Sequence, residues 1–197
     1  MKILKLLFCF NVSIFFFSCD QDQNVSPTFE SKPVASYDHE VITAWNDVLL
    51  KIEKNAEGYR PGPATRTLAY LGLSAYESVV YGMPEYNSFN GYWPGFDMPK
   101  FNTNLEYCWP LAINASFEYL LPKFFGKASE ADLDLIITTA QNFNERYKET
   151  VSIEVYNNSQ AWGKQVAESV WNYSKTDPIG HNHYLNPTQS YDWHKLM

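Results

Sequence analysis

The hydrophobic pattern is most complete in residues 61–82, PGPATRTLAYLGLSAYESVVYG, and it predicts a single helix there. Pro61 and Pro63 stand where a helix can begin without wasting amide donors, and Gly82 stands where helices commonly end. At about 100° per residue, the polar side chains share an arc of roughly a third of the circumference, and apolar side chains take most of the rest. A helix this apolar is packed on several sides, so we expect it at the centre of an all-α domain. The polar arc comprises Arg66, Thr67, Tyr70, Ser74, Glu77, Ser78 and Tyr81.

Arg66 and Glu77 are the two charged residues of this polar arc. They are eleven residues apart in the sequence, which is about 16 Å along a helix axis at about 1.5 Å per residue. They are too distant to pair with each other, so we interpret both as structural marks of the helix.

Four further helices are predicted from apolar residues at three- and four-residue steps, in 37–55, 104–121, 129–147 and 152–175. Pro110 indicates that the second of these either kinks or, as we favour, begins near Trp109, and Pro122 is expected to end it. Ser129 is a candidate N-cap, followed by acidic residues in the first turns. Gly163, among larger residues, indicates that a neighbouring helix passes close by.

Residues 83–103 are rich in proline, glycine, asparagine and aromatic residues, which excludes any long regular element. A loop of this length needs either a function or side chains that hold it in place. We favour the second interpretation over a role in lining a substrate entrance. The candidate anchors are Tyr86, Phe89, Tyr92, Trp93 and Phe96.

The N-terminus has the pattern of a bacterial lipoprotein signal, with Lys2 and Lys5 before an apolar run that is too short to span a membrane comfortably. We predict a signal peptide over 1–18, a lipid attached to Cys19, and a disordered tether over 19–36. Ordinary secretion and an uncleaved anchor are the alternatives. One helical domain over 37–176 and an irregular tail over 177–197 complete the predicted organisation.

Charge and cysteine content narrow the set of functions. The formal net charge is −7 and becomes −9 if residues 1–18, which contain two lysines and no acid, are removed. A chain this acidic does not attract nucleic acid by bulk electrostatics, so we expect no nucleic-acid partner. Cys108 is interpreted as a small buried residue, and no disulfide is expected.

The segments 63–69, PATRTLA, and 75–79, AYESV, resemble the N-terminal helical region of bacterial vanadium-dependent haloperoxidase-like proteins, in the type 2 phosphatidic acid phosphatase superfamily. The resemblance continues through 82–86 and 107–112 and extends over about residues 40–193. Gly72 stands where many relatives carry His, and Glu77 where many carry Asp. The resemblance implies the helical half of a larger all-α fold.

The catalytic motifs of that superfamily, by the same resemblance, are a lysine before an Arg-Pro pair, a Pro-Ser-Gly-His segment, and a Ser-Arg pair followed by histidine. Together they hold phosphate or vanadate and supply a proton-transfer group. Lys54 precedes Arg60-Pro61 with the wrong spacing, and neither Pro-Ser-Gly-His nor Ser-Arg occurs. We therefore predict no catalytic, cofactor-binding or metal-binding residue in this chain, and expect vanadate only in full-length relatives.

Several potential metal ligands gather near the C-terminus, where three histidines and two acids would suit a metal ion if the fold brought them together. No predicted helix fixes their spacing, so we favour polar loop residues. They are Asp177, His181, His183, Asp192 and His194.

We therefore expect an inactive N-terminal part of an exported haloperoxidase-like or acid-phosphatase-like enzyme, truncated before its catalytic half and anchored in a bacterial cell envelope. Two chains that complete one catalytic unit would fit the same sequence. The alternative from another class is a small helical envelope lipoprotein that binds a ligand or partner through the 83–103 loop.

Overall fold

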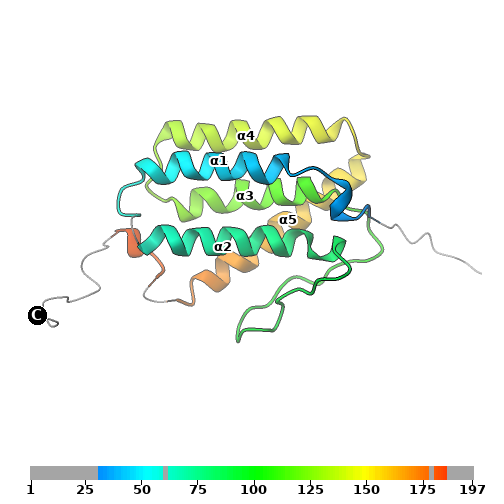
Figure 1. Cartoon of the computed structure of the whole chain (residues 1–197), viewed down its shortest axis with the longest axis horizontal. Coiled ribbons are helices and arrows are strands. Elements are labelled where there is room, and N and C mark those ends of the chain that lie inside the picture. The colour runs from blue at the N-terminus through cyan, green and yellow to red at the C-terminus, as the bar shows by residue number, and fades with distance from the viewer. Residues whose placement is uncertain (1–30, 60–61, 178–179, 186–197) are drawn as a thin grey trace, which may run out of the picture.

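The computed structural model describes residues 31–59, 62–177 and 180–185, and in these ranges the chain forms a helical bundle without strands (Figure 1). This confirms the predicted all-α class. The five main helices are α1 (Glu40–Asn55), α2 (Gly62–Val79), α3 (Trp109–Phe124), α4 (Glu130–Lys148) and α5 (Ile153–Ser174). Three short 3-10 turns accompany them: η1 (Val34–Ser36), η2 (Val80–Gly82) and η3 (His183–Leu185).

The central helix is α3, so the prediction that residues 61–82 lie at the centre was wrong. α3 packs against α1, α2, α4 and α5, whereas α2 packs mainly against α3 and α5 at one edge of the bundle (Figure 1). Leu111, Ala112, Leu120 and Leu121 of α3 are all completely buried. A helix apolar around most of its circumference can thus lie at an edge, where one of its apolar sides remains exposed.

The exposed side of α2 is apolar and much of its polar arc faces inward. Leu68 keeps 46% of its surface exposed, and Gly72 is exposed as well. Ser74, by contrast, is fully buried and its hydroxyl lies 2.6 Å from that of Ser116 on α3. Ser78 donates its hydroxyl to the Ser74 carbonyl at 2.7 Å. A serine hydroxyl that makes a hydrogen bond can be buried in a helix–helix contact at a low cost in free energy. The polar residues of α2 therefore did not indicate which side of the helix faces solvent.

Helix boundaries follow the sequence signals at most ends. α3 begins at Trp109 with Pro110 in its first turn, as favoured. The prediction that Pro122 ends this helix was wrong, because the helix continues to Phe124 and the amide of Phe125 still donates to the Leu121 carbonyl at 2.9 Å. α4 begins after a capping box in which Ser129 and Asp132 each accept a hydrogen bond from the other's amide.

α3 and α5 approach each other closely at Gly163. A Cβ atom on this residue would lie 2.0 Å from the Ala112 carbonyl oxygen, so only glycine fits there. The expected close approach of a neighbouring helix is confirmed.

The predicted tether requires a correction at its C-terminal end. Ser31 accepts a hydrogen bond from the Tyr107 amide at 2.9 Å, and the Lys32 carbonyl accepts one from the Trp109 indole at 2.7 Å. η1 follows directly, so residues 31–36 are packed on the bundle rather than disordered. The predicted signal peptide and Cys19 lie outside the described residues. Among the helices that the structure does describe, none is both long and apolar enough to cross a membrane.

Candidate functional site

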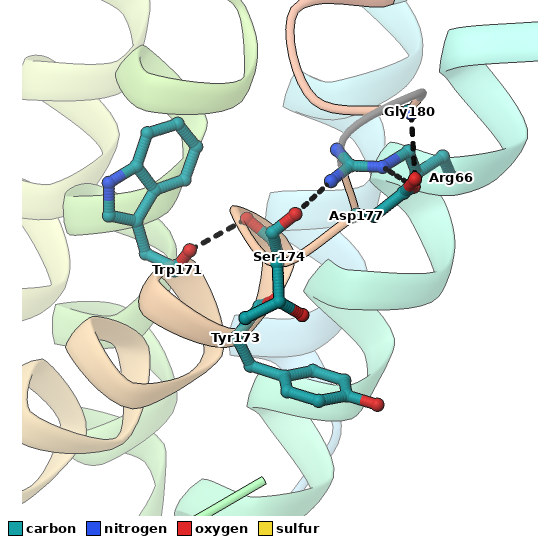
Figure 2. Close-up of polar contacts among 7 residues, drawn as sticks. Arg66, Trp171, Tyr173, Ser174, Asp177 and Gly180 are labelled. Atoms are coloured by element: carbon teal, nitrogen blue, oxygen red, sulfur yellow. Dashed lines mark hydrogen bonds and ion pairs between the residues drawn. The ribbon is translucent and has the colours of Figure 1, made fainter. Parts of the chain in front are cut away.

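Side chains of the α2 polar arc hold one irregular segment near each end of the helix. Near the N-terminal end of α2, the side chain is that of Arg66 (Figure 2). Its Nε donates to Asp177 Oδ2 at 3.1 Å, and a terminal nitrogen donates to the Ser174 carbonyl at the end of α5. The other carboxylate oxygen of Asp177 accepts the Gly180 amide at 2.8 Å. We call these four residues the C-terminal clasp, because they hold the chain that follows α5 against α2.

Gly180 is the tightest point of the C-terminal clasp. A Cβ atom there would lie 1.9 Å from Asp177 Oδ2 and 2.5 Å from Arg66 Nε. Any larger residue would push the carboxylate and the guanidinium apart. The sequence signalled Gly180 only as a helix breaker, so its role in the clasp was missed.

Tyr184 secures the tail beyond the clasp. Its ring stacks on Tyr59 with 4.9 Å between ring centroids, and Tyr59 stacks in turn on Phe125 at 4.6 Å. Two glycines leave room for Tyr184. A Cβ atom on Gly58, whose φ is +82°, would overlap the Tyr184 carbonyl oxygen, and a Cβ atom on Gly126 would overlap the Tyr184 hydroxyl. The described part of the tail is therefore a packed segment, although sequence periodicity gave no sign of it.

His181 and His183 make contacts with different parts of the bundle. His181 packs edge-on against Trp171 at 5.3 Å, whereas a Cβ on Gly62 would lie 3.7 Å from the ring of His183. Burial lowers the pKa of His181, and the positive charges of Arg66 and Lys175 lower it further, against the opposing effect of Asp177.

No metal site is evident in the part of the chain that the structure describes, where no three His, Cys, Asp or Glu side chains gather as ligands. Asp192 and His194 of the predicted cluster lie outside that part. His183 begins η3, and the interpretation of His181 and His183 as polar residues without a metal stays a prediction.

The small cavity lined by basic side chains at the C-terminal clasp is too narrow for an oxyanion such as phosphate or vanadate. Arg66, Lys123 and His181 line one cavity between α2, α3 and the tail, but its volume is about 10 Å³, room for roughly one water. Arg66 is also bonded to Asp177 and Ser174. Arg60 and Pro61 of the near-match motif lie outside the described residues.

Glu77 fixes the second irregular segment, the 83–108 loop, near the other end of α2. Its side chain is buried, with an exposed fraction of 1% for the residue. One carboxylate oxygen accepts the Ser88 hydroxyl at 2.6 Å, and the other accepts the Phe89 amide at 2.8 Å. A buried carboxylate with two charge-assisted hydrogen bonds is a strong anchor for a loop.

Aromatic rings hold the rest of this loop, which supports the structural interpretation of residues 83–103. Phe89 stacks on Trp93 at 5.1 Å, and Phe96 is completely buried. Tyr86 and Tyr92, also expected as anchors, are largely exposed. Phe101 was missed, although it stacks on Tyr81 at 4.2 Å.

Cys108 is a free and buried cysteine just before α3. Burial raises the pKa of its thiol, so the reactive thiolate is disfavoured. The interpretation as a packing residue is consistent with this environment.

No family model matches this chain, and no curated protein matches its sequence. Among solved structures, the crystal structure of a bacterial vanadium-dependent iodoperoxidase is similar, with a TM-score of 0.61 and 21% sequence identity. The match covers 81% of this chain and 36% of that protein. At this identity the likeness is one of fold: the bundle has the fold of part of a vanadium haloperoxidase.

Proposed function

We propose that this chain is the N-terminal helical part of a haloperoxidase-like or acid-phosphatase-like exported enzyme, and that it supports a separate catalytic part without being active itself. The observation that carries the proposal is the match of 81% of this chain to 36% of a bacterial vanadium iodoperoxidase. The sequence contains no Pro-Ser-Gly-His or Ser-Arg segment, and the cavity lined by Arg66, Lys123 and His181 has a volume of only about 10 Å³.

The exposed apolar side of α2 supports this role, because such a surface is suited to covering by further protein. Leu68, Ala69 and Gly72 are exposed along it. Beside them lies a groove of about 390 Å³ between α2, the long loop and α5. The groove is lined by Ala69, Tyr70, Leu73, Trp93 and Tyr173.

A vanadate cofactor belongs, in this proposal, to the catalytic part. When bound there it would activate peroxide, and in a phosphatase the same kind of pocket would hold the phosphate ester instead. The residues of this chain would pack against that part and keep its helices in position. Lipid attachment at Cys19 would place the protein in a bacterial cell envelope, and the apolar run between Lys5 and Cys19 supports this location.

The experiment compares this 197-residue chain with any longer polypeptide that the genomic DNA after the Met197 codon encodes in the same frame. Both are assayed, with vanadate present, for peroxide-dependent iodide and bromide oxidation, and without vanadate for phosphate-monoester hydrolysis. We expect turnover only in a longer polypeptide that carries Pro-Ser-Gly-His. Turnover by the 197-residue chain would contradict the proposal, and unrelated downstream sequence would favour the alternative, an envelope binding module.

A second test addresses the surface itself in that longer polypeptide. Leu68→Glu should lower turnover and thermal stability, because it introduces a charge where the catalytic part would pack. Leu50→Glu is the matched control, because Leu50 is a similarly exposed leucine on α1, at 60% against 46% for Leu68. Equal effects of the two substitutions would show that the α2 surface is not covered.

A further inference from the structure

The C-terminal clasp places an ionisable ring, His181, next to charged groups that already have partners. Its amide donates to the Asp177 carbonyl at 3.0 Å, and its side chain lines the same small cavity as Arg66. The Asp177 carboxylate is itself occupied by Arg66 and the Gly180 amide. A proton on His181 would therefore add a positive charge at a site where the Asp177 carboxylate already accepts hydrogen bonds from Arg66 and Gly180.

Among the described residues, charged and titratable groups face His181 from α2, α3, the end of α5 and the tail. Cations outnumber carboxylates among these groups, so they favour the neutral ring. The groups are Arg66 on α2, Lys123 on α3, Lys175 at the end of α5, and Asp177, His183 and Tyr184 in the tail.

Packing acts in the same direction as charge. The ring of His181 lies edge-on to Trp171 and lines the small cavity beside Phe124. An imidazolium in this place would lose part of its hydration, and the Asp177 carboxylate nearby already accepts hydrogen bonds from Arg66 and the Gly180 amide. The clasp thus binds the neutral form of His181 better than the charged form.

We propose that His181 makes the C-terminal clasp pH-sensitive, so that its protonation releases residues 180–183 from the bundle in mildly acidic solution. This inference is independent of the proposed function. It concerns only contacts within the described residues and holds for the chain alone or as part of a longer protein.

The direction follows from the linkage between protonation and opening. The pKa of His181 in the closed clasp lies below its ordinary value of 6.5, so the open form binds the proton more tightly. The clasp therefore has its full stability above about pH 6.5 and loses it as the pH falls toward the lowered pKa. The opening constant can rise by up to about tenfold for each pH unit that separates the two pKa values.

The test measures amide hydrogen exchange of residues 180–185 between pH 7.5 and 5.5, corrected for the intrinsic pH dependence of exchange. The amides of His181, His183 and Leu185 report directly, because each donates a backbone hydrogen bond within the tail. We expect their protection to fall several-fold across this range while amides within α3 remain unchanged. Constant protection of the tail would overturn the proposal.

Two variants identify the group responsible. His181→Gln keeps a polar side chain of similar length that cannot titrate, and it should make tail protection independent of pH. His183→Gln, two residues along the same segment, is the control and should keep the pH dependence of the wild type. A pH dependence that persists in His181→Gln, or that is lost only in His183→Gln, would show that His181 is not the switch.

Discussion

Arg66 and Glu77 occupy the same side of α2, yet the two segments that they hold are anchored very differently. Glu77 is buried, and its carboxylate accepts two hydrogen bonds from the 83–108 loop. Arg66 is partly exposed, and its partner Asp177 keeps 40% of its side chain at the surface. Solvent screens the second interaction and not the first. We infer that the loop is a permanent part of the bundle and that the tail can open.

The largest effect is expected from Glu77→Ala. The substitution leaves the partly buried Phe89 amide and Ser88 hydroxyl without their acceptor, so the free energy of unfolding should fall by about 3 kcal/mol. Urea denaturation followed by far-UV circular dichroism measures this change. Glu77→Gln keeps one acceptor and should lose only about 1 to 2 kcal/mol. Similar losses of stability in Glu77→Ala and Glu77→Gln would mean that the negative charge of the carboxylate is what holds the loop, since glutamine keeps an acceptor of similar size.

Arg66→Ala should have a smaller effect, about 2 kcal/mol in the same urea experiment. It removes the hydrogen bond to the Ser174 carbonyl, the partly screened pair with Asp177, and the contact with the Tyr70 ring. Hydrogen exchange should increase in the tail and not in the 83–108 loop. If Arg66→Ala lowered the free energy of unfolding as much as Glu77→Ala does, Arg66 would anchor the tail as strongly as Glu77 anchors the 83–108 loop.

Gly180→Ala tests the clasp without removing a charge. The added methyl group would overlap Asp177 Oδ2, and the tail can relieve this overlap by moving away. The loss of stability is then limited to that of opening the clasp, about 1 kcal/mol. Limited proteolysis should cut faster after α5 in this variant. An unchanged cleavage rate would show that the close approach at Gly180 does not matter for the tail.

Gly72→Ala is the matched control on α2 and should have the smallest effect, in the opposite direction. Among the described residues, no atom outside the adjacent residues and the nearby backbone of α2 lies within 4 Å of the position that the new Cβ would take. Alanine favours the helix over glycine, so the free energy of unfolding should rise by about 0.5 to 1 kcal/mol. A destabilised Gly72→Ala would indicate that this side of α2 is covered within the chain itself.

Local signals in the sequence predicted where the helices are, because these signals act over one turn of chain. Ser129 caps α4 as predicted, and Pro110 lies in the first turn of α3. Gly163 correctly indicated a close helix contact. The candidate site was less predictable. Asp177 was identified as polar, but its partner Arg66 lies 111 residues away in the sequence, and no local pattern reports such a pair.

The amino-acid sequence alone thus determined that this protein is all-α and where its helices begin, since periodicity, caps and prolines act within a few residues. Only the tertiary structure decided that α3 is central, that the serines of α2 face inward, and that Tyr184 and Gly180 hold the tail. These outcomes depend on which partners are available at a distance, and a buried hydroxyl or carboxylate costs little once the fold supplies its hydrogen-bond partner.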